Sequence, residues 1–269
     1  MILCHSSFRN GAKSRIFGHS IVYILNDSLV IIPTYNEKEN AEAIIRKVFS
    51  LAFPFDLLIV DDNSPDGTQD IVKRLMIEFP DRLHLLARPG KQGLGTAYIA
   101  GFKWALEREY EFVFEMDADF SHNPEDLIRL RKACVEGADI AIGSRYVTGV
   151  NVVNWPMSRV ILSYFASKYV KIITGMPIND ATAGFKCYRR KVLQTIRFDR
   201  IKFVGYAFQI EMKFKSWFFG FKLAEVPIIF TDRTMGQSKM SKGIVKEAAF
   251  GVIQLKLWSM FRAKRGYHQ

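Results

Sequence analysis

The sequence contains few cysteines: Cys4, Cys134 and Cys187 are the three among 269 residues. Three cysteines cannot form a disulfide framework, and their spacing does not match that of a zinc site. Disulfide-stabilised secreted domains and small zinc domains are therefore excluded as classes. We expect the protein to work in a reducing compartment.

The sequence also lacks a long apolar run. A membrane-spanning helix needs about 18 or more consecutive apolar residues. The stretch 156–175 is interrupted by Arg159, Lys168 and Lys171, and the stretch 218–230 carries two further charges. We therefore expect no membrane-spanning segment.

What the chain has in excess is positive charge. The formal net charge is +11, and 49% of the residues are hydrophobic, which is enough for a sizeable core. Such a charge favours an anionic partner: a nucleic acid, an anionic membrane face or a phosphorylated substrate. Charge alone does not distinguish these three.

Short apolar runs alternate with helical segments in the first half of the chain, which is the pattern of a parallel sheet with crossover helices. The runs are residues 29–32, 57–60, 83–86, 112–114 and 140–142. The helices between them are predicted near residues 38–51, 67–79, 95–108 and 124–134. Asn123 is the expected N-cap of the last of these, with Pro124 at its first position. The fold class is therefore α/β.

After Gly143 the pattern changes to long aromatic and basic helices, with strands near residues 184–188 and 223–230. We expect residues 1–27 to be an extension outside the core, 28–241 to form one domain, and 242–269 to be a basic amphipathic helix. Its predicted apolar face comprises Ile244, Val245, Ala248, Val252, Leu255, Trp258 and Phe261. This helix either lies on an anionic membrane surface or packs against the core.

Polar groups follow each of the first four predicted strands. They are Pro33-Thr-Tyr-Asn-Glu37, Asp61-Asp62-Asn-Ser-Pro-Asp-Gly67, Lys91-Gln-Gly-Leu-Gly95 and Asp117-Ala118-Asp119. Taken singly, each is equally typical of a turn or a helix cap. Together they indicate a nucleotide site, because α/β sheets bind ligands beyond the carboxyl ends of their strands. Paired carboxylates there suit a divalent metal that also binds phosphates, and the glycines permit close approach of the backbone to a phosphate.

These residues closely resemble glycosyltransferase family 2, which has the GT-A fold, and within it the polyprenol-phosphate (dolichol-phosphate) mannosyltransferases. The resemblance runs from about residue 27 to about residue 242. It includes Gly143-Ser-Arg-Tyr146, Ala183-Gly-Phe-Lys186 and Thr231-Asp-Arg-Thr-Met-Gly-Gln-Ser-Lys239 in addition to the four groups above.

The resemblance implies roles for individual residues. The nucleotide-sugar would be held by Pro33, Tyr35, Glu37, Val60, Asp62, Lys91, Asp117, Ala118, Asp119, Arg145, Arg233 and Lys239. Asp117 and Asp119 would bind Mg²⁺ or Mn²⁺, and Arg145, Arg159 and Ser163 would bind the acceptor phosphate. Asp119, Arg145, Arg233 and Lys239 would be catalytic. The sequence departs from some members at Ser121, where they have a glutamine that contacts the metal.

The resemblance also implies the reaction: metal-assisted transfer of mannose from GDP-mannose to a polyprenyl monophosphate, with inversion. A phosphate monoester is largely ionised at pH 7, so no general base is expected. The enzyme would bind peripherally to the cytoplasmic face of a membrane, with or without an anchoring partner protein.

Two alternatives stay open at this point. The first is transfer of glucose from UDP-glucose to the same lipid. The second is a nucleic-acid-binding module, which the acidic strand ends disfavour because they repel a phosphate backbone.

Overall fold

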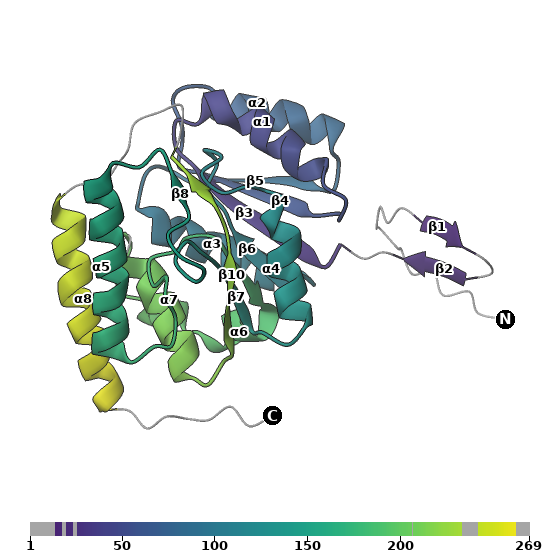
Figure 1. Ribbon diagram of the computed structural model, residues 1–269. Helices are drawn as coiled ribbons and strands as arrows, with labels where there is room; N and C mark the ends of the chain where they lie inside the picture. The colour runs from purple at the N-terminus through teal and green to yellow at the C-terminus, as the bar shows by residue number, and fades with distance from the viewer. Residues whose placement is uncertain (1–13, 18–19, 24–25, 206, 233–241, 262–269) are drawn as a thin grey trace.

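The computed structural model describes residues 14–17, 20–23, 26–205, 207–232 and 242–261. Its centre is a seven-stranded sheet with the strand order β10-β7-β9-β6-β3-β4-β5 (Figure 1). The neighbours are parallel except that β9 is antiparallel to both β6 and β7. The predicted α/β class is confirmed. The strands are β3 Ser28–Thr34, β4 Asp56–Asp61, β5 Leu83–Ala87, β6 Phe112–Glu115, β7 Ile140–Ser144, β9 Lys186–Arg189 and β10 Leu223–Pro227.

Helices cover both faces of this sheet. Alternate residues of β3 divide between two cores: Leu29 and Ile31 contribute to one, and Val30 and Ile32 to the other. Because side chains alternate across a strand, a strand that is apolar at every position must be buried on both faces. The helices are α1 Lys38–Phe49, α2 Thr68–Glu78, α3 Leu94–Leu106, α4 Asp126–Val135, α5 Met157–Thr174, α6 Arg190–Thr195, α7 Ala207–Phe218 and α8 Lys242–Met260, with a 3₁₀ turn at Phe198–Arg200.

Two of the differences from the predicted boundaries have local reasons. Helix α4 begins at Asp126, because Asn123 Oδ1 accepts a hydrogen bond from the Glu125 N–H and holds residues 123–125 in a turn. The predicted strand 223–230 is two strands. β10 ends at Pro227, and β11, Phe230–Thr231, pairs with β8, Val152–Val153, outside the main sheet.

Asn26 and Asp27, just before β3, contact the core. Asn26 Nδ2 donates to Asp56 Oδ1 at 2.6 Å, and Asp27 pairs with Arg131 at 2.6 Å. Before them lie β1, Ser14–Phe17, and β2, Ser20–Tyr23, which pair with each other as an antiparallel hairpin. The sequence pattern did not predict this hairpin.

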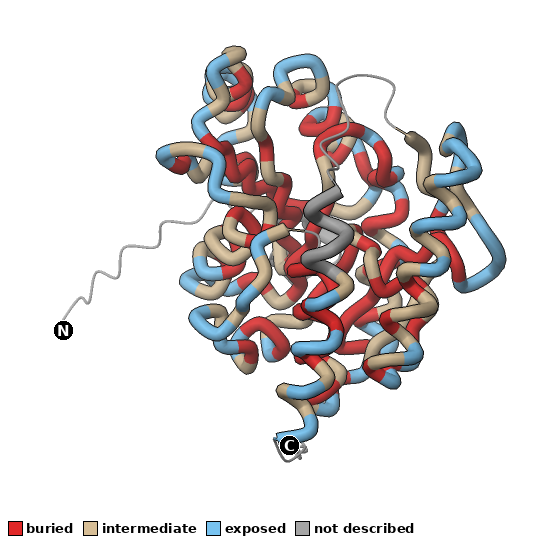
Figure 2. Tube along the Cα trace, turned by 90° about the vertical axis from the view of Figure 1, so that its left-hand side faces the viewer, coloured by how far each residue is buried: buried red, intermediate tan, exposed pale blue. Residues whose placement is uncertain are grey.

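One face of the final helix packs against the core. Val252 and Leu255 are buried, and the Trp258 ring lies 5.1 Å from that of Phe218 on α7. The Tyr169 hydroxyl of α5 donates to the Ala249 carbonyl at 3.0 Å. Buried and exposed residues alternate along α8 in Figure 2, which views this side of the molecule. Core packing is therefore observed for Val252, Leu255 and Trp258 of the predicted apolar face, whereas Phe261 is exposed. The side chains of residues 242–248 lie outside the described part. None of the described helices is long and apolar enough to cross a bilayer.

A buried ion pair lies in the middle of the sheet. Glu115 of β6 and Lys186 of β9 are directly opposite in the antiparallel register, and Lys186 Nζ lies 3.0 Å from Glu115 Oε2. Glu115 also accepts from Gln209 Nε2 at 2.7 Å and from the Tyr188 hydroxyl at 2.9 Å. Both charged side chains are fully buried. The pair joins β6, β9 and α7 just before the chain reaches Asp117.

Replacing Glu115 alone should therefore destabilise the protein strongly. The variant Glu115→Leu leaves Lys186 buried without its counterion, and we expect a loss of about 3–5 kcal/mol in the free energy of unfolding. The double variant Glu115→Leu/Lys186→Met removes both charges of the pair, so most of the loss should be recovered. Urea unfolding of the three proteins measures this. Equal losses in the single and double variants would contradict the ion-pair account.

Candidate active site

The first two strand-end loops are joined by hydrogen bonds at the carboxyl edge of the sheet. The Asn36 N–H donates to Ser64 Oγ at 3.0 Å, the Glu37 N–H to Thr68 Oγ1 at 3.1 Å and the Lys38 N–H to an Asp66 carboxylate oxygen at 3.0 Å. These bonds make residues 34–38 and 61–68 one ridge. The predicted clustering of strand-end groups is therefore present on this side.

The two adjacent aspartates after β4 have different surroundings. Asp61 is fully buried and accepts from Thr34, Ser64 and Gln69, so it holds the loop together. Asp62 lies 3.1 Å from Arg88 Nε, and both side chains are largely buried. Burial raises the pKa of Asp62, against the opposing effect of Arg88. The sequence analysis placed Asp62 in the site but missed Arg88, which follows β5.

Other predicted nucleotide-binding residues surround this ridge. Lys91 Nζ lies 5.0 Å from the centre of the Tyr35 ring, so a cation and an aromatic face are adjacent. Glu37 and Pro33 are half-buried beside them. Val60 is also predicted to bind the nucleotide-sugar, and this role stays a prediction. It is fully buried in the core and supports the edge from inside the sheet.

The glycines of the Lys91–Gly95 loop accommodate another part of the chain. Gly93 has φ +102°, and a Cβ placed on it would lie 3.1 Å from the Val204 carbonyl oxygen. A Cβ on Gly95 would lie 2.7 Å from Phe208, and the Gly95 N–H donates to the Val204 carbonyl at 2.8 Å. Val204 and Phe208 thus occupy the space beside these two glycines where a phosphate was expected.

Asp117 and Asp119 lie in the turn that follows β6. The Asp119 carboxylate is largely buried and accepts from the Ser121 N–H at 3.1 Å, whereas the side chain of Asp117 is 39% exposed. Between Asp119 and Ser121, Phe120 has a left-handed φ of 58°, a conformation that is uncommon for a residue with a side chain. Ala118 is buried, so a ligand would meet its backbone only.

The donor set fits a hard divalent cation that shares its coordination with a ligand. Two carboxylates leave several positions of an octahedral ion for phosphate oxygens and water. Within the described residues there is no group of three or more histidine, cysteine, aspartate or glutamate side chains that would hold a metal unaided. Ser121 is buried and adds no charge. Any metal here therefore depends on the ligand for part of its coordination.

His122 was missed by the sequence analysis and packs directly against this turn. The Asp117 N–H points to His122 Nδ1 at 3.3 Å, and the imidazole stacks on Phe185 at 4.8 Å. Burial lowers the pKa of His122 to about 4, so the ring is neutral and its Nδ1 is able to accept. A single histidine after two aspartates carries no distinctive sequence signal, because its partner is a backbone group.

Arg145 is held by a buried carboxylate. Its Nε and Nη2 lie 2.7 and 2.6 Å from the two oxygens of Asp180, and Nη2 also donates to Thr182. Although burial opposes ionisation, Arg145 holds the pKa of Asp180 below its usual range. The guanidinium also lies 5.5 Å from the Trp155 ring. The structure thus gives Arg145 a fixed position, and its contact with a ligand stays a prediction.

Apart from Arg145, the predicted acceptor residues, Arg159 and Ser163, lie on α5. Arg159 pairs with Asp232 at 2.8 Å and lies 4.0 Å from the Trp155 ring, and Ser163 follows one turn later on the same helix. Residues four apart share a helix face. Arg233 and Lys239 lie outside the described residues.

Comparison with known proteins agrees with this arrangement. Residues 29–197 match Glycosyl transferase family 2. The chain belongs to this family. It is a glycosyltransferase, and the family membership favours an enzyme over the nucleic-acid-binding alternative.

Two curated relatives are similar over nearly the whole chain. Polyprenol monophosphomannose synthase of Mycolicibacterium smegmatis is 46% identical over 239 residues, which is 89% of this chain and 90% of that protein. Undecaprenyl-phosphate mannosyltransferase of Micrococcus luteus is 46% identical over 241 residues, which is 88% of this chain and 98% of that protein.

Solved structures share the fold at low sequence identity. Glucosyl-3-phosphoglycerate synthase from Mycobacterium tuberculosis, solved with Mn²⁺, UDP and phosphoglyceric acid, has a TM-score of 0.62 at 13% identity and covers 88% of this chain and 80% of its own. A mannosyltransferase from Pyrobaculum calidifontis, solved with GDP-Man and Mn²⁺, has a TM-score of 0.53 at 16% identity and covers 87% and 74%. The expected GT-A architecture is confirmed.

We predict that His122 acts on the metal-binding turn through its Nδ1 acceptor. His122→Phe keeps a ring against Phe185 but leaves the Asp117 N–H without its partner, so the affinity for Mn²⁺ in the presence of nucleotide should fall roughly 10- to 100-fold. His122→Asn retains an acceptor near the Nδ1 position and should lose less. Calorimetric titration with Mn²⁺ checks both variants. Equal affinity in the wild type and the Phe variant would refute the role.

Proposed function

We propose that the enzyme transfers mannose from GDP-mannose to a polyprenyl monophosphate with the help of a divalent cation. The observation that carries the proposal is the 46% identity to two enzymes named for this kind of product, over about nine-tenths of each chain. The groups described above would supply the matching chemistry. The ridge of residues 34–38 and 61–68 would bind the nucleotide, the turn with Asp117 and Asp119 the cation, and the arginines near α5 the acceptor phosphate.

On the donor side, the ridge formed by residues 34–38 and 61–68 would bind the nucleoside. The half-buried Tyr35 ring offers a face for the base, and Asp62 offers a carboxylate for hydrogen bonds from ribose or base. Lys91 beside Tyr35 would approach the diphosphate. Arg88 holds Asp62 in place and limits its movement when a ligand binds.

Asp117 and Asp119 would hold Mg²⁺ or Mn²⁺. The bound cation would neutralise charge that develops on the diphosphate as it leaves. A divalent cation accords with the Mn²⁺ in both structural neighbours described above. His122, Phe120 and Ser121 would keep the turn in shape before the donor arrives.

No residue is required to deprotonate the acceptor. A phosphate monoester has its second pKa near about 6 and is already a nucleophile at pH 7. The nearby groups agree with this: Asp61 already accepts hydrogen bonds from three residues, and burial lowers the pKa of His122 to about 4, so its imidazole is a weak base. Catalysis would rest on holding the acceptor oxygen in line with the departing diphosphate, with inversion at the sugar.

The acceptor phosphate would bind at Arg159 and Ser163 on α5, near Arg145. A guanidinium can contact a phosphate through two N–H groups, which favours arginine over lysine at this position. Arg233 and Lys239 would add charge from the segment after β11. Asp232, which pairs with Arg159, immediately precedes that segment in the chain.

We expect Asp119→Asn to lower sugar transfer from GDP-mannose roughly 100-fold or more, because the turn would hold the cation with one charge fewer. Asp126→Asn is the matched control, because Asp126 is also largely buried but pairs with Arg129 at the start of α4. Transfer of labelled mannose into organic-extractable lipid measures both variants. Full activity of Asp119→Asn would exclude the proposed metal role, and comparable losses in both variants would point to general destabilisation.

We further propose that the enzyme binds peripherally to the cytoplasmic face of a membrane through α5 and α8, which lie side by side (Figure 1). Each helix exposes an apolar stripe with the spacing of one helix face. We call these residues together the α5–α8 surface: Met157, Ile161, Leu162, Phe165 and Ile172, with Phe250, Ile253, Leu257, Met260 and Phe261. A lipid bilayer is the occupant that suits this surface best.

Two features favour a bilayer over a protein partner. Helix α5 contains Arg159, Lys168 and Lys171 and no acidic residue, which suits an anionic membrane surface. The same helix carries Arg159 and Ser163 of the acceptor site, so binding there would bring the site close to the lipid phosphate.

Charges placed in this surface should release the protein from membranes. We predict that Phe165→Glu/Phe250→Glu lowers co-sedimentation with vesicles containing anionic lipid at least several-fold, because carboxylates are costly in the interface and repel the lipid. Ile77→Glu is the matched control, since Ile77 is 82% exposed on α2. Unchanged sedimentation of the double variant would exclude the surface. Binding only to membranes that contain a second protein would favour an anchoring partner instead.

A further inference from the structure

A short segment that begins in the 3₁₀ turn contacts helix α8 on one side and, on the other, the loop of residues 88–96, which we call the donor loop. Residues 200–205, which we call the strap, start at the last residue of that turn and contact both α8 and the start of α3. We propose that Glu211 of α7, by anchoring the strap, is a positioning residue for the nucleotide-binding loop 88–96. The proposal deepens the proposed function, on which it rests.

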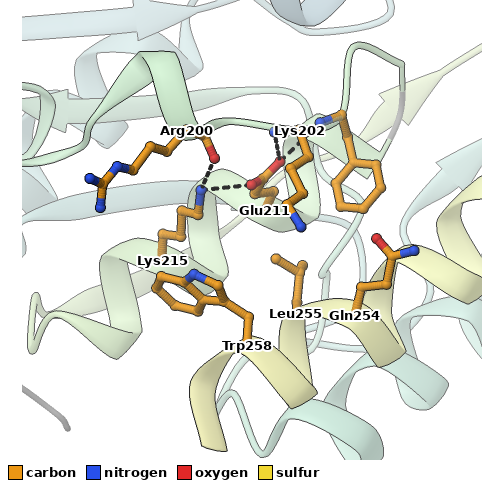
Figure 3. Close-up of a pocket in the computed structure, with 8 residues that line it drawn as sticks. Arg200, Lys202, Glu211, Lys215, Gln254, Leu255 and Trp258 are labelled. Carbon is orange, nitrogen blue, oxygen red and sulfur yellow. Dashed lines mark hydrogen bonds and ion pairs between the residues drawn. The ribbon is translucent and has the colours of Figure 1, made fainter. Parts of the chain in front are cut away.

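Glu211 is a fully buried carboxylate whose oxygens face the strap. Its Oε2 accepts hydrogen bonds from the N–H groups of Lys202 and Phe203 at 2.9 and 3.1 Å. Its Oε1 lies 2.7 Å from Lys215 Nζ, which also donates to the Arg200 carbonyl at 2.6 Å (Figure 3). One ion pair on α7 therefore fixes the strap backbone at three residues. A buried charge held in this way is costly to displace.

The next residue of the strap contacts the donor loop. The Val204 carbonyl accepts the Gly95 N–H at 2.8 Å, and Val204 lies so close to Gly93 that a side chain there would be crowded. Beyond Gly95, Thr96 Oγ1 accepts from Arg88 at 2.8 Å, and Arg88 pairs with Asp62. A shift of the strap would thus move the groups proposed to bind the nucleotide.

Helix α8 limits the strap from the other side. A Cβ placed on Gly251 would lie 2.7 Å from the Phe203 ring, so the helix and the ring are in direct contact. Gln254, Leu255 and Trp258 of the same helix line a small pocket next to Glu211 and Lys215 (Figure 3). The strap is therefore set between the outer helix and the donor loop, and Glu211 determines where it lies.

The decisive variant removes the anchor without leaving a buried charge. In Glu211→Met/Lys215→Met, both partners become apolar, and such replacements of buried ion pairs are often tolerated. Glu211→Gln is the conservative variant, because its amide oxygen still accepts from the strap. Asp139→Asn is the matched control. Asp139 is also a largely buried carboxylate: it accepts the Lys222 N–H at 2.8 Å and pairs with Lys191. It precedes β7, so it lies at the amino end of that strand, away from the carboxyl ends that carry the site.

Two readouts test the role. Hydrogen–deuterium exchange in the ligand-free protein should show faster exchange of the Gly95 amide in the double variant and wild-type exchange in Asp139→Asn. The dissociation constant for GDP with Mn²⁺ should rise about tenfold in the double variant, while turnover at saturating GDP-mannose changes little. Glu211→Gln should restore most of the affinity.

The possible results separate this inference from the proposed function. Unchanged Gly95 exchange and GDP affinity in the double variant would overturn the positioning role, as would an equal loss of affinity in Asp139→Asn. If wild-type protein bound no GDP, the proposed donor would be wrong, and the exchange of Gly95 would still decide the role of Glu211. Gly251→Ala gives an independent check, because its methyl group must displace Phe203 and should weaken GDP binding in the same direction.

Discussion

The buried pair of Glu115 and Lys186 is the interaction on which the rest of the active-site edge depends. β9 is the one strand of the main sheet that runs against its neighbours, and this pair fixes its register against β6. Gln209 adds α7 to the same cluster. Asp117 comes only two residues after Glu115. The turn that contains Asp117 and Asp119 therefore starts from a point fixed by β6, β9 and α7 together.

Other buried or half-buried carboxylates hold the loops around the site in a similar way. Asp61 holds the loop after β4, and Glu211 holds the strap behind the donor loop. On the acceptor side, Glu225 accepts the N–H groups of Asn179 and Asp180, and Asp180 in turn binds Arg145. Each carboxylate replaces solvent as the partner of a loop backbone. The loops can then hold ligand-binding groups in place before the ligand arrives, which lowers the ordering cost of binding.

Much of this architecture was predictable from the sequence, because fully buried strands and strand-end polar groups leave strong patterns. The strands from β3 to β7 and the polar groups after them, including the turn with Asp117 and Asp119, were all located from apolar runs and their flanking residues. Contacts between distant segments were not predictable. Arg88 and His122 act through Asp62 and a backbone N–H, and neither partner is visible in a local pattern.

The glycine loop illustrates the same limit. Gly93 and Gly95 have the sequence appearance of a phosphate-binding loop, yet the space beside them is taken by Val204 and Phe208, more than a hundred residues later. Asn123 was predicted to be a helix N-cap. Its side chain does accept a backbone hydrogen bond, from the Glu125 N–H, but this bond closes a turn that precedes the helix.

The most direct test of the account is a donor comparison with the wild-type enzyme. Labelled GDP-mannose and UDP-glucose are offered in parallel with polyprenyl phosphate, with Mg²⁺, Mn²⁺ or a chelator, and the anomeric configuration of the lipid product is determined by NMR. The account predicts metal-dependent labelling from GDP-mannose alone and a β-linked product from the α-linked donor. Labelling from UDP-glucose, undiminished transfer with chelator, or a product of retained configuration would each contradict it.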